Sequence, residues 1–388
     1  MTPIDTVLQQ AVESGDVPGL VAMAANDSDI IYQGAAGRRG DATAPAMTTD
    51  TVFRIASMTK AVASVAAMQL VEQGRLSLDE ALETKVPQLA ERQVFDGFDA
   101  SGTPRLRPAA RPLSLRHLLT HTSGYCYEMW NAEFIKFAEQ SATPRFTDGG
   151  DGFLDSPLVF DPGQRWEYGI STDWVGRVVE HLSGHNLADY CREHIFQPLG
   201  MTDTGFSPSP DQRSRLVNVC QRQDDGSLVQ IEFELPFDGR FFGGGGGLYA
   251  TAGDYLAFVR MLLSGGTYKG AQVLKPETVG LMGENHIGQL SVGAATSAIP
   301  FLSNDIEFFP GQDKKWGLGF LINTQALDTG RSAGSLSWAG IFNSYYWIDP
   351  HKKVTGVLMM QILPFFDATA LGVLDGFETQ VYRQLGRV

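Results

Sequence analysis

Residues 57–68 read Ser57-Met58-Thr59-Lys60 followed by AVASVAAM, and the chain stays free of helix breakers until Gly74. In a helix over this segment, apolar side chains would occupy almost every face of residues 61–68, with Ser64 as the exception. A helix without a polar face is a buried helix, and a glycine is a common helix end. The segment therefore predicts a central, buried helix that begins at Ser57 and carries Ser57 and Lys60 at its N-terminal end.

The first four residues of this segment also suggest chemistry. Positions i and i+3 of a helix share a face, so Lys60 can reach the hydroxyl of Ser57. A serine becomes a good nucleophile when a neighbour takes its proton. A lysine can do so in its neutral form, which burial and a helix N-terminus favour. Ser-x-x-Lys is a short pattern, and a helix cap followed by a solvated lysine is the alternative interpretation.

Two later segments extend the candidate site. Tyr168 follows the turn Asp161–Gly163 and precedes a predicted helix, so its hydroxyl could pass a proton between Ser57, Lys60 and a leaving group. Residues 337–341, Ser-Trp-Ala-Gly-Ile, predict an edge strand whose backbone N–H could pair with that of Ser57 in an oxyanion hole. Each such donor stabilises a transition state by about 3 kcal/mol. The alternatives are a half-buried tyrosine at a helix start and a strand with a core tryptophan.

The remaining pattern predicts strands at both ends of the chain and helices in the middle. Strands are expected at 19–25, 30–34, 317–323, 335–340, 344–348 and 354–361, and helices at 5–13, 113–120, 172–182, 187–196, 252–263 and 368–385. This order predicts an α/β (α+β) chain with an antiparallel sheet built from both termini. We expect an α/β domain formed by residues 1–75 and 215–388, a mainly helical domain over 76–214, and the active site at their junction.

Taken together, the three motifs resemble those of class C β-lactamases, serine DD-peptidases of the penicillin-binding protein superfamily, and family VIII carboxylesterases. The segments between the motifs are similar too: Gly74–Asp79, Leu118–Tyr125, Pro198–Thr204, Gly246–Thr251 and Trp316–Phe320. The resemblance extends from about Gly19 to Gly356. It implies a β-lactamase/DD-peptidase-like fold and a serine hydrolase that works through an acyl-enzyme.

The resemblance also implies a role for each matching residue. Ser57 would be the nucleophile, Lys60 the general base and Tyr168 the proton relay. The backbone N–H groups of Ser57 and Ile341 would form the oxyanion hole. The substrate would contact Tyr125, Ile170, Trp338 and Gly340.

Two departures from the β-lactamase pattern narrow the expected activity. Ile170 stands where β-lactamases carry an asparagine, and Trp338 stands where they carry a lysine or histidine that helps to hold a substrate carboxylate. Bulky apolar groups there form a wall suited to an uncharged acyl or alcohol group. Family VIII esterases resemble this chain in carrying Trp-x-Gly. We therefore expect a carboxylesterase that hydrolyses short-chain esters.

Three alternatives stay open at this stage. An acyltransferase on the same fold would pass the acyl group to an alcohol. A β-lactamase or DD-peptidase would show weak activity on β-lactams. A non-catalytic binding module could keep the fold, although the intact Ser57, Lys60 and Tyr168 argue against it.

Three other sequence patterns give weaker evidence for a functional site. Gly330–Gly334 matches the esterase elbow Gly-x-Ser-x-Gly around Ser332, but a strand follows it where the elbow requires a helix. His117/His121 and His181/His185 have metal-ligand spacing without the glutamate of His-Glu-x-x-His, so structural histidines are expected. The run Gly243–Gly247 lacks the lysine of a phosphate loop and is expected to be flexible backbone beside the site.

Composition excludes several classes of function. The 388 residues carry a net charge of −14, which argues against binding to nucleic acid or to anionic lipid. We see no signal peptide and no apolar stretch of membrane-spanning length, and we expect a cytoplasmic protein. The cysteines Cys126, Cys191 and Cys220 form neither a disulfide framework nor a metal motif. We expect no cofactor and no metal, and a small-molecule ester as the partner; the sequence leaves the oligomeric state open.

Overall fold

The computed structural model describes residues 1–386, and the largest sheet within them has seven strands in the order β11-β12-β13-β14-β15-β1-β2. Every neighbouring pair is antiparallel. The strands are β1 (Gly19–Asn26), β2 (Ile30–Gly37), β11 (Lys314–Trp316), β12 (Leu321–Asn323), β13 (Leu336–Gly340), β14 (Ser344–Asp349) and β15 (Val354–Met359). Because β1 pairs with β15, the two ends of the chain share one sheet, which confirms the predicted architecture.

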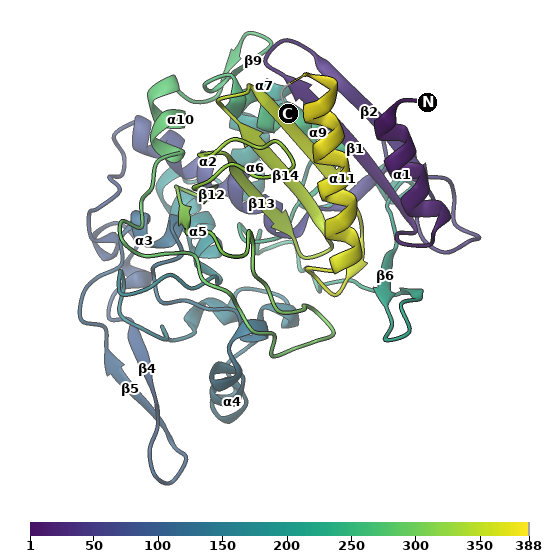
Figure 1. Cartoon of the computed structure of the whole chain (residues 1–388). Coiled ribbons are helices and arrows are strands. Elements are labelled where there is room, and N and C mark those ends of the chain that lie inside the picture. The colour runs from purple at the N-terminus through teal and green to yellow at the C-terminus, as the bar shows by residue number, and fades with distance from the viewer. Residues whose placement is uncertain (387–388) are drawn as a thin grey trace.

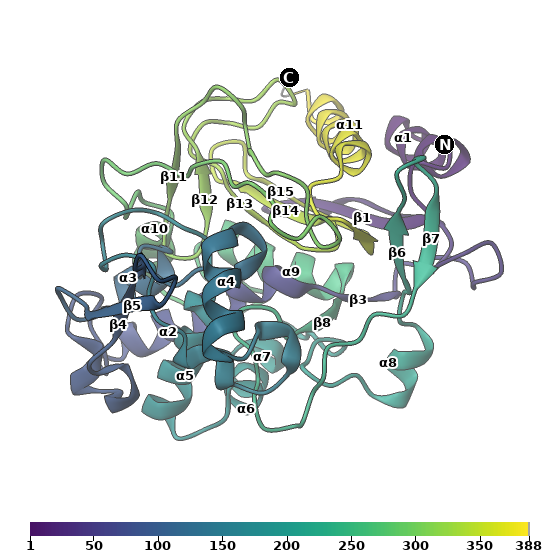
Figure 2. The same ribbon diagram turned by 90° about the horizontal axis from the view of Figure 1, so that it is seen from below.

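Helices cover both faces of this sheet (Figures 1 and 2). On one face lie α1 (Pro3–Glu13) and α11 (Ala368–Gln384), and on the other lie α9 (Ala252–Leu263) and α2 (Thr59–Glu72). Successive side chains of a strand point to opposite faces. In β1, Leu20, Ala22 and Ala24 accordingly join the core beneath α1 and α11, whereas Val21, Met23 and Ala25 join the core around α2 and α9. The apolar run of β1 thus results from burial on both sides.

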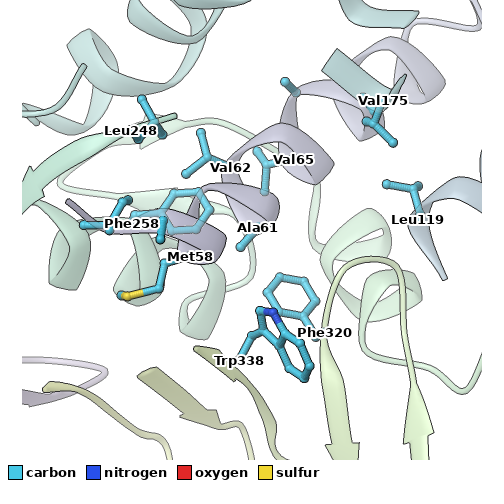
Figure 3. Packing of buried hydrophobic residues seen from close by; sticks show 14 of the residues in the cluster. Met58, Ala61, Val62, Val65, Leu119, Val175, Leu248, Phe258, Phe320 and Trp338 are labelled. Carbon is cyan, nitrogen blue, oxygen red and sulfur yellow. The ribbon is translucent and has the colours of Figure 1, made fainter. Parts of the chain in front are cut away.

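The helix α2 is the buried helix that the sequence predicts. Residues Thr59–Leu70 are all buried, and Figure 3 shows Val62 and Val65 surrounded by Leu248, Val175 and Leu119 from other parts of the chain. The predicted start is two residues too early. Ser57 lies in a 3₁₀ turn, Ala56–Met58, and the α-helix begins at Thr59.

Most elements in the middle of the chain are helices, and several of them lie on the side of α2 away from the sheet (Figure 2). Its helices are α3 (Leu115–Leu119), α4 (Ala132–Ser141), α5 (Ser171–Ser183), α6 (Leu187–Cys191), α7 (Gln197–Leu199) and α8 (Pro210–Ser214), with a π-helical turn after α6. It also holds a hairpin, β4 (Gln93–Phe98) with β5 (Pro104–Pro108), which the arginine- and proline-rich sequence of β5 does not suggest. The domain boundaries at 75 and 215 stay a prediction.

Short elements complete the chain. They are β3 (Val52–Arg54) paired with β8 (Tyr249–Thr251), β6 (Val219–Arg222) between β7 (Leu228–Ile231) and β16 (Ile362–Leu363), β9 (Thr267–Tyr268) paired with β10 (Ala271–Gln272), and α10 (Pro276–Met282). Within residues 1–386, every helix is too short or too polar to cross a membrane.

Two predictions about the late strands are wrong. Residues 317–323 do not form one strand, because a turn containing Gly319 (φ +101°) separates β11 from β12. The strand β13 is not at the edge of the sheet, since it lies between β12 and β14. However, β12 pairs only with Leu336 and Ser337. The rest of β13 therefore extends past β12 and contacts the Ser57 turn instead.

Candidate active site

The turn that carries Ser57 is fixed from several directions. The N–H of Ile55 donates to the Leu248 carbonyl (3.1 Å), and the Leu248 N–H donates to Oγ1 of Thr59 (3.2 Å). Ala56, just before the serine, has φ +45°, a left-handed conformation that is unfavourable by about 1–2 kcal/mol for a non-glycine residue. Such conformations persist where the surroundings enforce them, often at functional sites. Ser57 remains partly exposed within an otherwise buried segment.

Lys60 is 1% exposed and is surrounded by oxygen atoms. Its Nζ lies 3.2 Å from Ser57 Oγ, 3.0 Å from the Tyr127 hydroxyl and 2.6 Å from the Gly245 carbonyl oxygen. An ammonium group has three N–H donors, and a neutral amine has two donors and one lone pair. The carbonyl can only accept, so the lone pair of a neutral Lys60 is available to a hydroxyl. The Lys60 amine therefore has hydrogen-bond partners in both its protonated and its neutral state. A group that accepts the serine proton and later returns it requires partners in both states.

Two tyrosines face Lys60 and have different partners. The Lys60 Nζ lies 5.1 Å from the ring centroid of Tyr127 and 4.8 Å from that of Tyr168. The Tyr168 hydroxyl accepts a hydrogen bond from Nε1 of Trp338 (3.0 Å), whereas the Tyr127 hydroxyl bonds to the lysine. Burial raises the pKa of Tyr127 well above its usual value, so this phenol stays protonated near neutral pH. Sequence reasoning selected Tyr168 and missed Tyr127.

His121 packs behind Tyr168, with ring centroids 4.7 Å apart. Burial, and then the charge of Lys60, lower the pKa of His121 well below its usual value. The imidazole is therefore neutral near physiological pH, and its place next to Tyr168 supports a structural role.

The extended end of β13 comes very close to the Ser57 turn. A Cβ atom on Gly340 would lie 2.5 Å from the Ile55 carbonyl oxygen, so the backbone approach requires a glycine. Ile341, the next residue, lines the same cavity as Ser57 and Trp338. The predicted motif residues of the late strand and of the serine helix are thus brought together.

Ser57 opens into a cavity of about 240 Å³ with a largely aromatic wall. Its lining includes Tyr127, Trp130, Tyr168, Trp338 and the phenylalanines Phe146, Phe153, Phe206, Phe233, Phe241 and Phe308. Two arginines, Arg54 and Arg213, also line it, but both pair with Glu234, at 3.2 and 3.6 Å. The cavity suits an apolar ligand with a polar reacting centre.

Of the four residues predicted to contact the substrate, Trp338 lines the cavity, whereas Tyr125, Ile170 and Gly340 are not part of its lining. Tyr125 is fully buried and stacks on Trp174 (centroids 6.4 Å apart), and Ile170 is buried as well. Among the described residues, the cavity lining includes Tyr127 but neither Tyr125 nor Ile170. The sequence Tyr125-Cys126-Tyr127 contains two tyrosines, and the second of them contacts Lys60 and lines the cavity.

The Gly330–Gly334 loop has a structural role. In the loop Gly330–Gly334, Arg331 is buried in an ion pair with Glu378, and the Ser332 N–H donates to Asp349 (2.9 Å), away from the cavity. No group of three or more potential metal ligands occurs in residues 1–386.

The glycine run 243–247 packs tightly, contrary to the expected flexible backbone. A Cβ on Gly244 would lie 2.5 Å from the Thr172 carbonyl oxygen, and one on Gly245 would lie 2.2 Å from Asp173 Oδ2. The glycines allow this turn to lie against the start of α5, where the Gly245 carbonyl faces Lys60.

These contacts predict the effect of Tyr127→Phe. Removing the hydroxyl deletes a partner of Lys60 while keeping the ring, so kcat should fall by about 10–100-fold, as expected for a loss of about 1.5–3 kcal/mol from a hydrogen bond to a charged group. Tyr125→Phe is the matched control, because the buried Tyr125 hydroxyl has no hydrogen-bond partner among the described residues. Steady-state kinetics and thermal unfolding of both variants check this. Equal activities would remove Tyr127 from the reaction.

Comparisons with known proteins agree with this geometry. The family model described as Beta-lactamase matches residues 4–375. The chain is 32% identical over 398 residues to lovastatin esterase of Penicillium rubens, covering 98% of both chains, and 31% identical to monacolin J acid methylbutanoyltransferase of Aspergillus terreus, covering 98% of this chain and 95% of that one.

Among solved structures, unliganded simvastatin synthase from Aspergillus terreus superimposes with a TM-score of 0.86 at 29% identity, covering 99% of this chain and 98% of that chain. The match along almost the whole length agrees with the contact between Ser57 and the buried Lys60 and with the antiparallel sheet. The chain therefore belongs to the beta-lactamase family and is an enzyme of the serine hydrolase type.

Proposed function

We propose that this protein hydrolyses carboxylic esters through an acyl-enzyme on Ser57. The observation that carries the proposal is the contact at 3.2 Å between the buried amine of Lys60 and the Oγ of Ser57, a residue that lines an aromatic cavity. A buried lysine beside a partly exposed serine is the arrangement that activates a hydroxyl.

In the acylation step, Ser57 Oγ attacks the ester carbonyl carbon while its proton passes to the lone pair of Lys60. The backbone N–H groups of Ser57 and Ile341 are proposed to stabilise the oxyanion that forms. The support for this pair is the close packing of Gly340 on the carbonyl of Ile55, which brings the end of β13 beside the serine turn.

Collapse of the tetrahedral intermediate needs a proton for the departing alkoxide. The Trp338 N–H occupies a lone pair of the Tyr168 oxygen, so the phenolic proton of Tyr168 is free to point into the cavity. Tyr168 donates this proton to the alcohol and regains one from Lys60. A water molecule then attacks the acyl carbon while Lys60 takes its proton. When this second tetrahedral intermediate collapses, the bond to Ser57 Oγ breaks, Lys60 returns the proton to Ser57 Oγ, and the free acid leaves.

The cavity wall favours substrates whose acyl and alcohol parts are uncharged. Its ring-rich lining gives an ester apolar contacts, and both arginines in the lining already pair with Glu234. We also propose that the enzyme prefers short acyl chains. Measuring hydrolysis rates over a series of esters of increasing acyl chain length tests this preference.

Acyl transfer is the second candidate function. Relatives that cover almost the whole chain include a methylbutanoyltransferase and an esterase, so water and an alcohol are both candidate acceptors of the acyl group. Adding increasing concentrations of an apolar alcohol to a p-nitrophenyl ester assay separates the two. A hydrolase forms mainly free acid, and a transferase forms mainly the new ester.

Esters should be much better substrates than penicillins. With Trp338 in the place of a cation, a penicillin loses a charge-assisted hydrogen bond worth about 1.5–3 kcal/mol, which corresponds to roughly 10–100-fold in kcat/KM. Measuring kcat/KM for p-nitrophenyl butanoate and for a penicillin checks this. A penicillin value equal to the ester value would refute the assignment as an esterase.

A further inference from the structure

Asp173 is a buried carboxylate that the mechanism above does not use. It lies in the first turn of α5, is 5% exposed and belongs to the lining of the cavity. Its Oδ1 accepts a hydrogen bond from the N–H of Gly245 at 2.8 Å. The carbonyl of the same glycine accepts from Lys60 at 2.6 Å. Asp173 and Lys60 are thus connected through one residue.

The residues that form this connection pack closely against one another. Gly245 packs so closely on Asp173 that a Cβ would overlap the carboxylate, and Gly244 fits against the Thr172 carbonyl. Burying a carboxylate is unfavourable unless charges or hydrogen bonds compensate it. Here the Gly245 N–H, the N-terminal end of α5 and the charge of Lys60 do so, although burial still raises the pKa of Asp173.

We propose that Asp173 is a positioning residue that stabilises the Lys60 ammonium formed when Ser57 loses its proton. It does so in two ways: it orients the Gly245 carbonyl toward Lys60, and it adds a negative charge behind that carbonyl. The role is comparable to that of the aspartate in a serine–histidine–aspartate triad, which holds and stabilises the imidazolium. The inference rests on the proposed acylation of Ser57.

The other groups around Lys60 are neutral or bound elsewhere. Tyr127 stays protonated and His121 uncharged near neutral pH, because burial raises the pKa of the first and lowers that of the second. Tyr168 contributes its ring face and bonds to Trp338. On α5, Arg177 follows one turn after Asp173 and pairs with Glu180 and Asp151. Asp173 is therefore the carboxylate that acts on Lys60 from this helix.

Asp173→Asn separates the two contributions. The amide oxygen can still accept from Gly245, but the charge is lost. The acid limb of the kcat/KM profile should move to lower pH by about one unit, because an opposite charge nearby holds the proton on a lysine. The plateau of kcat/KM should fall by up to about tenfold, since one pKa unit corresponds to a factor of ten in an equilibrium constant. Asp173→Ala also releases the Gly245 carbonyl and should lose at least a further tenfold in kcat at similar KM.

Asp367→Asn is the matched control. Asp367 is buried at 4% exposure, caps the N-terminus of α11 and pairs with Arg222, away from the cavity lining. The substitution Asp367→Asn should lower the melting temperature and leave the pH profile of kcat/KM unchanged. If Asp173→Ala does not fold, Asp173→Asn decides alone.

Labelling with a fluorophosphonate keeps the two claims distinct. An unlabelled Ser57 in the wild-type protein refutes the proposed function. A labelled Ser57 together with an Asp173→Asn profile that coincides with the wild-type profile in plateau and in acid limb refutes the role of Asp173 alone.

Discussion

Ser57→Ala is expected to lose almost all esterase activity, while Ser332→Ala keeps most of it. Removing the nucleophile of a well-studied serine enzyme lowers kcat by on the order of 10⁶. Ser57 lies in the cavity beside Lys60, and its replacement removes the only atom of this site that forms the acyl bond in the proposed mechanism. Rates with a p-nitrophenyl ester on purified, folded variants measure the difference.

Ser332 is the matched control, because it also lies in a motif typical of esterases. Its N–H bonds to Asp349, and its carbonyl accepts from Asn323 (2.8 Å) and from Ser335 (2.8 Å), so the backbone of the loop makes the contacts and the hydroxyl is dispensable. Loss of activity in Ser332→Ala at an unchanged melting temperature would show that the nucleophile is Ser332 and not Ser57.

Lys60→Arg should reduce kcat by about 10²–10⁴-fold, the usual contribution of a general base. A guanidinium keeps the charge but cannot give up a proton in this pH range. A guanidinium is also larger than an amine, and the Nζ of Lys60 already lies 3.2, 3.0 and 2.6 Å from Ser57, Tyr127 and Gly245, so overpacking should lower the stability by about 1–3 kcal/mol. Kinetics and thermal unfolding measure the two effects separately.

Lys314→Arg serves as the comparison for that variant. Lys314 is buried at 6% exposure in β11 and does not line the cavity, so its replacement tests the effect of a larger buried cation alone. Near-normal turnover in Lys60→Arg, with the fold intact, would exclude the lysine as the base.

The sequence predicts features that depend on neighbours along the chain. The helix 252–263 occurs with the predicted bounds and with Thr251 as its cap, because capping is a local pattern. Lys60 approaches Ser57 because it follows three positions later in the chain, about one helical turn. The start of the helix differs from the predicted one because Leu248, far along the chain, holds Ile55 and Thr59 in a tight turn.

Features that depend on distant segments could not be predicted from sequence. The Tyr127 hydroxyl and the Gly245 carbonyl reach Lys60 from 67 and 185 residues away. Periodicity does not distinguish Tyr125 from Tyr127, and the packing of Trp174 on the first decides between them. The break between β11 and β12 has a local signal in Gly317-x-Gly319, because closely spaced glycines favour a turn over a continuous strand.

The acyl-enzyme itself is the most direct test of the central claim. The protein is mixed with a p-nitrophenyl ester for milliseconds to seconds, quenched in acid, digested and mapped by mass spectrometry. We expect the mass of the acyl group on the peptide that contains Ser57, and its loss as free acid appears when quenching is delayed until the substrate is exhausted. An acyl group on another residue, or p-nitrophenol release without any acylated peptide at every quench time, would contradict hydrolysis through Ser57.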